Sequence, residues 1–197
     1  VTTEGGIQGW GEAQAPISPE TTAKIIETLL GPMVLGEPIS EVERIHEMMY
    51  DAMNVRGHYQ GFFMDATSAL DIAMWDALGR HFDRPVSALF GGRERDSLPA
   101  YVSLPGFSTE EKINQAAEFI DAGFTGVKIF GGADVTEDID TVEKIRSQVG
   151  PAPQVMVDAF WSYTPVEARK ITRQPQDDIS FLEAPLSPED IRGHRRL

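Results

Sequence analysis

Three ionisable side chains each end an apolar segment of the sequence, and their types suit acid–base or metal-dependent chemistry. Lys128 follows Gly-Val, Asp158 follows Val-Met-Val, and Glu183 follows Phe-Leu. The intervals between them are 30 and 25 residues, a spacing typical of successive strand–helix units in a parallel sheet. Because active sites of (β/α) barrels lie at the carboxyl ends of the strands, we expect these side chains to converge. A single aspartate at the end of a strand is more often a turn or capping residue. That interpretation explains less well why charged residues occur in three successive strands.

Two of these residues carry carboxylate groups, which predicts a binding site for a divalent cation. Without a cation, carboxylates held a few ångströms apart repel each other and one of them is driven to protonate. The sequence has no cysteine, and no histidine lies near Asp158 or Glu183. Oxygen ligands of this kind suit Mg²⁺ or Mn²⁺ better than Zn²⁺. We therefore expect Asp158 and Glu183 to be metal ligands.

The fold class expected from residues 93–197 is α/β. Near-continuous apolar segments predict buried parallel strands, and helical patterns with N-terminal signals follow them. Four strand–helix units are visible, about half of the eight in a TIM (β/α) barrel. The alternative is a small open sheet that is complete as it stands. The strand candidates start near residues 100, 126, 154 and 179, and the helix signals are Ser108-Thr109-Glu110-Glu111, Thr136-Glu137-Asp138 and Thr164-Pro165.

The first 92 residues have a different character. Gly5-Gly6 predicts the turn of a β-hairpin, and Ser18-Pro19-Glu20 predicts a helix start with Ser18 as the N-cap. A second helix is expected near Ser40, and a third over residues 62–82. The third helix carries a stripe of alanines at helical spacing, which we interpret as a core contact and not as a cofactor site.

Composition excludes several classes of function. There are 17 basic and 31 acidic side chains, a formal net charge of −14, so a nucleic-acid partner is not expected. No segment reaches the roughly 20 apolar residues of a membrane span, and no signal peptide is recognisable. We expect a cytoplasmic protein with no membrane partner.

Several motifs resemble the mandelate racemase branch of the enolase superfamily, which also contains the muconate lactonizing enzymes. The resemblance implies a partial α+β capping domain at residues 1–92, followed by the first half of a modified TIM (β/α) barrel at residues 93–197. It also implies that Asp158 and Glu183 are the first two ligands of Mg²⁺, with the third beyond Leu197. The motifs are GWGEA at 9–13, ALDIAMWD at 69–76, PVSALFGG at 85–92, and the strand ends GVKIF, VMVDAF and FLEAPL.

The same resemblance suggests a reaction type. Lys128 matches the first lysine of the family's Lys-x-Lys motif, which implies a catalytic role in contacting the substrate carboxylate and stabilising an enediolate. The second lysine position is Phe130, and Phe160 stands where many relatives have a polar residue. Neither phenylalanine can move a proton, so the implied base is a histidine outside this chain. One base favours elimination of water from an acid sugar by a lyase. The alternatives are a racemase or epimerase, or a catalytically silent fragment or interaction module.

Other candidates carry weaker signals. His58 and Tyr59 occupy the loop that closes over the site in this family, so they are predicted substrate contacts, with an ordinary solvated loop as the alternative. Trp161 and Tyr163 either line the pocket or pack beneath a loop. The substrate is expected to be a small carboxylate, an acid sugar, and the full-length protein to be a homo-oligomer. Residues without an assigned chemistry are His46 and His81, which lack a recognisable acidic partner, Glu12, Asp71 and Asp76 as family framework, and the basic cluster Arg192, His194, Arg195 and Arg196 as a solvated face.

Overall fold

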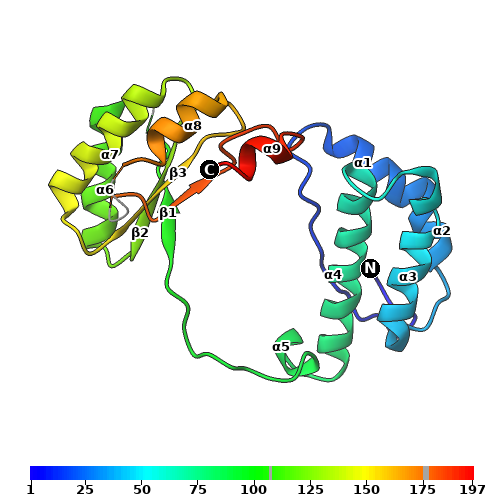
Figure 1. Cartoon of the computed structure of the whole chain (residues 1–197). Coiled ribbons are helices and arrows are strands. Elements are labelled where there is room, and N and C mark those ends of the chain that lie inside the picture. Colours follow the sequence, from blue (N-terminus) through cyan, green and yellow to red (C-terminus); the bar gives the residue numbers. More distant parts are fainter. Residues whose placement is uncertain (107, 175–177) are drawn as a thin grey trace. The chain divides into compact units, whose positions relative to one another are not determined.

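The computed structural model describes residues 1–106, 108–174 and 178–197. The chain forms two compact units, Val1–Asp96 and Ser97–Leu197, and each is described by itself (Figure 1). In the described part of the chain, no helix combines the length and the apolar character needed to cross a membrane.

The first unit begins with a short hairpin. A single antiparallel bridge joins Thr2 to Gln8, and the amide of Gly6 donates to the carbonyl of Thr3 at 2.9 Å. The central residues of the turn are therefore Glu4 and Gly5, one position earlier than the expected Gly5-Gly6 pair. Gly6 follows with φ 82°, a left-handed conformation that glycine adopts without steric cost.

The predicted helices of the first unit are present, with differences at their starts. Ser18 holds the N-cap position, but its hydroxyl pairs with the hydroxyl of Thr21 at 2.8 Å and makes no bond to the helix backbone. The expected cap is therefore wrong, because Ser18 has φ 57° instead of the extended conformation of a capping residue. The elements are α1 Pro19–Ile25, a π-helical turn Ile26–Leu30, α2 Gly31–Val34, a 3₁₀ turn Ile39–Glu41, α3 Val42–Asp51, a 3₁₀ turn Asn54–Arg56, α4 Phe62–His81 and α5 Val86–Leu89.

The alanine stripe of α4 is a core contact, as expected. A Cβ atom at Gly9 would lie 2.0 Å from the carbonyl oxygen of Ala73, and one at Gly11 would lie 2.0 Å from that of Ala69. The chain segment around Trp10 thus lies directly on the helix backbone. The amide of Trp10 donates to Asp76 at 2.9 Å, and this bond, followed by that from Arg80, lowers the pKa of Asp76. Asp76 therefore serves the framework of this unit.

The second unit alternates strands and helices, as the sequence predicts. Its described strands form a parallel sheet in the order β1-β2-β3-β4, and helices pack against it (Figure 1). Capping boxes begin α6 and α8 at Ser108 and Thr164, whereas α7 is capped by Asp134, two residues before the expected Thr136. The elements are β1 Tyr101–Ser103, α6 Thr109–Asp121, β2 Gly126–Phe130, α7 Val135–Val149, β3 Gln154–Asp158, α8 Pro165–Ile171, β4 Phe181–Glu183 and α9 Ile191–His194.

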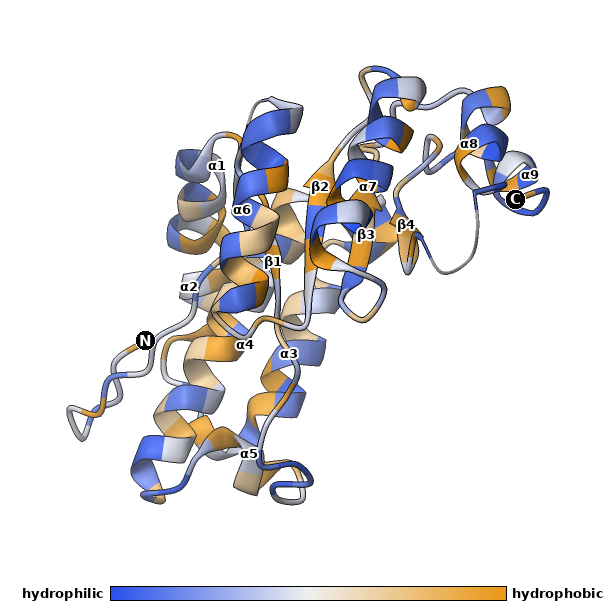
Figure 2. Cartoon of the chain, turned by 90° about the vertical axis from the view of Figure 1, so that its left-hand side faces the viewer, coloured by the Kyte–Doolittle hydropathy of each residue, from blue (hydrophilic) through white to orange (hydrophobic). Residues whose placement is uncertain are grey.

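The two faces of this sheet differ. Alternate strand residues such as Val127, Ile129, Val155 and Val157 are fully buried in one core cluster with residues of the helices. Figure 2 shows β2, β3 and β4 largely in the hydrophobic colour. Because strand side chains alternate between faces, the opposite face carries the other set. That set contains Lys128 and Phe130 of β2, Met156 and Asp158 of β3, and Phe181 and Glu183 of β4.

Candidate active site

The structure brings Lys128, Asp158 and Glu183 together. Asp158 pairs in register with Glu183, one strand away from Lys128. The Nζ atom of Lys128 donates to Glu183 Oε2 at 2.7 Å and lies 3.5 Å from Asp158 Oδ2. The lysine and aspartate side chains are only 10% and 9% exposed, whereas that of Glu183 is 43% exposed. The result is a small charged centre with one open side.

The electrostatics of this centre favour a cation. Burial opposes the charged form of Lys128, but the hydrogen bond and charge of Glu183, with Tyr101 and Asp158 nearby, raise its pKa above the ordinary value. The ammonium also lies 5.8 Å from the ring centre of Tyr101 and 5.7 Å from that of Phe130, where the negative faces of aromatic rings attract positive charge. With one lysine and two carboxylates, the centre keeps a net negative charge.

The carboxylate of Asp158 is held by the chain that follows it. Its Oδ1 atom accepts a hydrogen bond from the amide of Phe160 at 3.1 Å, while Oδ2 faces Lys128. The amide of Gly131 donates to the carbonyl of Asp158, and that of Ala159 to the carbonyl of Glu183. The ends of β2, β3 and β4 are thereby tied together, which fixes the two acidic side chains at neighbouring strand ends.

The donor set of this centre fits part of a divalent-cation site. Asp158 and Glu183 offer oxygen atoms only, as Mg²⁺ prefers, and the ammonium of Lys128 between them shows that the position attracts positive charge. Among the described residues, no group of three or more acidic, histidine or cysteine side chains is placed to hold a metal ion. These residues could therefore supply two ligands of a larger set.

The turn after β3 has an unusual backbone that the sequence did not predict. Phe160 has φ 47° and Trp161 has φ 58°, and Ala184 after β4 has φ 46°. The amide of Trp161 donates to the carbonyl of Ala184 at 2.6 Å. Left-handed residues that are not glycine or asparagine are uncommon, so residue type gave no signal here. Such strain often marks a functional site.

Asp138 is a buried residue near the site that sequence reasoning did not assign. Its carboxylate is 6% exposed and accepts hydrogen bonds from the amide of Gly132 at 2.8 Å and the hydroxyl of Tyr163 at 2.6 Å. Burial, followed by the bond to Asp138, raises the pKa of Tyr163 well above its ordinary value. A Cβ atom at Gly131 would lie 2.7 Å from this carboxylate. The Gly-Gly pair after β2 was the available signal, because it allows such a close approach.

Tyr163 and Trp161 differ in how far their side chains are exposed. Tyr163 is 5% exposed and packs beneath the loop, which resolves the two alternatives for that residue. Trp161 is 54% exposed. His58 and Tyr59 lie in the first unit, on the exposed segment between the 3₁₀ turn Asn54–Arg56 and α4. Their contact with a substrate stays a prediction.

One expectation about a histidine is wrong. His46 has an acidic partner, since its Nδ1 atom lies 3.3 Å from Asp71 Oδ1. The pair forms because α3 packs against α4, a tertiary contact between residues 25 positions apart. The ring centre of His81 lies 5.0 Å from the ring centre of Phe82. The basic cluster at the end of the chain is exposed, which agrees with a solvated face.

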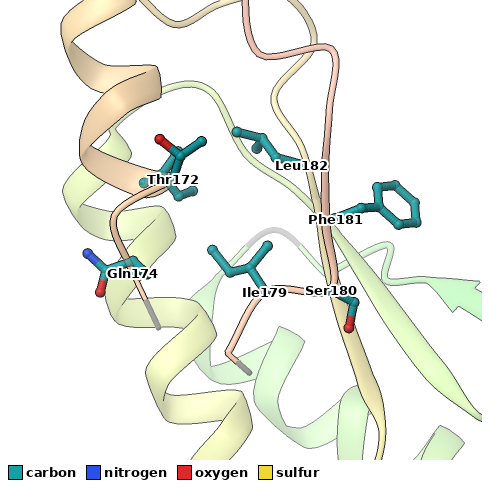
Figure 3. A pocket seen from close by; sticks show the side chains of 7 residues that line it. Thr172, Gln174, Ile179, Ser180, Phe181 and Leu182 are labelled. Carbon is teal, nitrogen blue, oxygen red and sulfur yellow. The ribbon is translucent and has the colours of Figure 1, made fainter. Parts of the chain in front are cut away.

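A cavity lies elsewhere on the second unit. It has a volume of about 400 Å³ and lies between the end of α8 and the start of β4. In Figure 3, Ile179 and Leu182 point toward Thr172, whereas the ring of Phe181 points away. None of Lys128, Asp158 and Glu183 lines this cavity, so we place the candidate active site at the charged centre.

The chain matches two described protein families. Residues 1–91 match the family described as mandelate racemase / muconate lactonizing enzyme, N-terminal domain, and residues 111–197 match the family described as enolase C-terminal domain-like.

Individual relatives agree with these matches. The chain is 30% identical to D-galactarolactone cycloisomerase from Agrobacterium fabrum and to arabinonate dehydratase from Saccharolobus solfataricus, matching over its whole length but covering 53% and 54% of those proteins. The crystal structure of a racemase from Streptomyces coelicolor with bound magnesium superposes with a TM-score of 0.87 at 27% identity, over 99% of this chain and 59% of that one.

The chain thus spans about half the length of the curated relatives it matches. The expected fold class is confirmed: the chain combines helices with a parallel sheet, and its structural relatives are TIM barrel proteins of the enolase superfamily, of which it covers about half. The chain belongs to the enolase superfamily, in the branch of mandelate racemase and the muconate lactonizing enzymes.

Proposed function

We propose that this chain contributes two metal ligands and a lysine to a Mg²⁺-dependent lyase that dehydrates an acid sugar. The observation that carries the proposal is the convergence of three charged side chains on adjacent strands: Lys128 within β2, and Asp158 and Glu183 at the ends of β3 and β4. Relatives named as an acid-sugar dehydratase and a sugar-lactone cycloisomerase support this reaction class. The substrate is a small molecule that carries a carboxylate.

Asp158 and Glu183 are the proposed ligands of the cation. Their oxygen atoms lie at neighbouring strand ends, and one oxygen of Asp158 is held by the amide of Phe160. A bound Mg²⁺ would stabilise the negative charge that develops on the substrate carboxylate as the α-proton leaves. The magnesium in the structure of the related racemase supports this choice of ion.

Lys128 is proposed to contact the substrate carboxylate. Its ammonium lies within 3.5 Å of both acidic residues, so an anionic group beside the metal ligands would also lie close to it. A positive charge at that place stabilises the enediolate form more than the substrate itself, because charge builds up on the carboxylate during proton removal.

The aromatic residues at the site favour elimination over racemisation. A racemase handles protons on both faces of the planar intermediate, which requires two proton-transferring groups. Phe130 lies at the end of β2 and Phe160 in the turn after β3, and neither can transfer protons. A dehydratase needs one base, which we expect to be a histidine outside this chain. In the reaction the α C–H and β C–OH bonds break, a carbon–carbon double bond forms, and water leaves. The resulting enol becomes a keto acid.

A racemase is the second candidate, because the related racemase superposes over nearly the whole chain. In that case Lys128 itself would serve as one base. The two functions differ in product: a racemase exchanges the α-proton of both enantiomers with solvent, whereas a dehydratase releases a keto acid.

The test uses the whole protein that carries this chain, with Mg²⁺ and a panel of acid sugars in deuterated water. We expect keto-acid formation that is lost in Asp158→Asn and Glu183→Gln and retained in the control Asp121→Asn, an exposed residue of α6. Deuterium exchange into both enantiomers without any keto acid would replace the dehydratase proposal by the racemase.

A further inference from the structure

Three aromatic side chains near the charged centre transfer no proton in the proposed chemistry. Phe130, Phe160 and Trp161 are 38%, 51% and 54% exposed. The ring centres of Phe130 and Phe160 lie 5.2 Å apart, and those of Phe160 and Trp161 lie 6.2 Å apart. Together they form a continuous exposed surface, which we call the aromatic wall.

The aromatic wall adjoins the reacting centre. Phe130 pairs in register with Asp158 and lies on the same sheet face as Lys128, whose ammonium is 5.7 Å from its ring centre. The amide of Phe160 donates to the carboxylate of Asp158. A substrate whose carboxylate lies beside these charged groups would therefore extend along the wall.

The backbone that presents the wall is strained and held by specific bonds. Both Phe160 and Trp161 adopt a left-handed conformation, which costs free energy for bulky side chains. Hydrogen bonds from Trp161 to Ala184 and from Ser162 to Phe160 and Ala159 hold the turn. An exposed pair of aromatic residues gains little from such a conformation by itself, because water covers much of the rings. A ligand that covers the rings would supply the compensating interaction.

We propose that the aromatic wall is a subsite for the C–H face of a closed-ring acid sugar that keeps a free carboxylate outside the ring and a β-hydroxyl. The assignment rests on the proposed function, since it assumes that the substrate carboxylate lies at Lys128, Asp158 and Glu183. Aromatic faces pack well against a flat apolar surface. A ring presents its C–H bonds on one such surface and brings few rotatable bonds to immobilise. An open polyol chain would bury hydroxyl groups against the rings without partners, which is unfavourable.

The test measures binding, independently of turnover. The whole protein, loaded with Mg²⁺, is titrated calorimetrically with tetrahydrofuran-carboxylate and with open-chain α-methoxybutyrate, which has the same number of carbon atoms. We expect the ring to bind about tenfold more tightly. In Phe130→Leu and Phe160→Leu, which keep an apolar side chain but remove the aromatic face, the two ligands should bind with nearly equal affinity.

Three further variants make the test specific. Phe82→Leu removes an exposed aromatic residue of the first unit and should retain the preference for the ring. Phe160→Tyr and Trp161→Phe keep aromatic faces and should retain it as well, which separates loss of stacking from disturbance of the turn. An unchanged preference in both leucine variants would overturn the subsite.

The outcomes for the subsite and for the proposed function are distinguishable. If the protein forms keto acids but the leucine variants keep the ring preference, the subsite is wrong and the function stands. If no acid sugar is converted, yet the ring preference is present and is lost in the leucine variants, the subsite stands and the function is wrong.

Discussion

The hydroxyl of Tyr163 donates a 2.6 Å hydrogen bond to the buried carboxylate of Asp138. The same carboxylate accepts a hydrogen bond from the amide of Gly132. One side chain of α7 thus joins the segment after β2 to the segment after β3. These two segments follow Phe130 and Asp158, so the network supports the active-site end of the sheet.

This bond predicts how one tyrosine responds to alkaline pH. The chain has four tyrosines, and burial raises the pKa of Tyr163. Below a pH of about 10, the ordinary tyrosine pKa, Tyr163 is neutral in both the folded and unfolded states. Its hydrogen bond to Asp138 then makes its full contribution to the free energy of unfolding. Above that pH the unfolded chain loses this proton and the folded chain does not, so the contribution falls as pH rises.

The measurement is absorbance of tyrosinate during alkaline titration. Tyr163→Phe should leave the number of phenols that ionise in the folded protein unchanged, and it should lower the free energy of unfolding at neutral pH by about 1–3 kcal/mol, because the buried Asp138 loses a partner. A variant with one fewer phenol ionising near pH 10 would show that Tyr163 is accessible and contradict the structure.

The close approach of the N-terminal segment to α4 predicts a large difference between two glycine substitutions. In Gly11→Ala the new methyl group would lie 2.0 Å from the carbonyl oxygen of Ala69, which the backbone must move to avoid. We expect a loss of about 1–3 kcal/mol in the free energy of unfolding. Gly5→Ala is the matched control, since the nearest atom to its added methyl group lies at 3.9 Å. Denaturant melts measure both, and equal stability would contradict the packing.

Substitutions of the acidic and basic residues of the charged centre should change Mg²⁺ affinity in opposite directions. Asp158→Asn and Glu183→Gln each remove a proposed ligand, so Mg²⁺ affinity should fall by more than the roughly 10–100-fold that loss of an outer partner costs. Lys128→Met removes a positive charge next to both carboxylates, so Mg²⁺ affinity should rise while turnover falls. Calorimetric titration of the whole protein with Mg²⁺ measures the affinities. Weaker metal binding in Lys128→Met would show that the lysine organises the site.

The edges of the parallel sheet predict association of the isolated chain. In the sheet as the structure describes it, β1 and β4 each pair on one side, and unpaired strand edges template contacts between molecules. Residues 1–197 expressed alone should therefore form oligomers or aggregates. Light scattering with size-exclusion chromatography measures this, and Phe181→Lys, which places a charge at an exposed position of β4, should reduce it. A monodisperse monomer would contradict the prediction.

The sequence by itself determined the elements and the residues at their ends. Apolar segments separated by capped helices predicted β2, β3 and β4, and the charged residue in each segment pointed to Lys128, Asp158 and Glu183. The expected strand-end position is correct for the two acidic residues, whereas Lys128 lies in the middle of β2. These features depend on local patterns: burial on both faces makes a strand apolar throughout, and a capping residue acts within one turn of its helix. The core contact of α4 could also be predicted from its stripe of small residues, because only small side chains permit close packing.

Tertiary structure decided how these residues meet. The bond between Lys128 and Glu183 spans 55 residues, that between Asp138 and Tyr163 spans 25, and the pair of His46 with Asp71 depends on how α3 packs against α4. The left-handed conformation of Phe160 and Trp161 was equally unpredictable, because neither residue type favours it. It is held by backbone bonds to Ala159 and Ala184, and one of these partners is brought close only by the pairing of β3 with β4. Contacts that long-range packing creates leave no local signal in the chain.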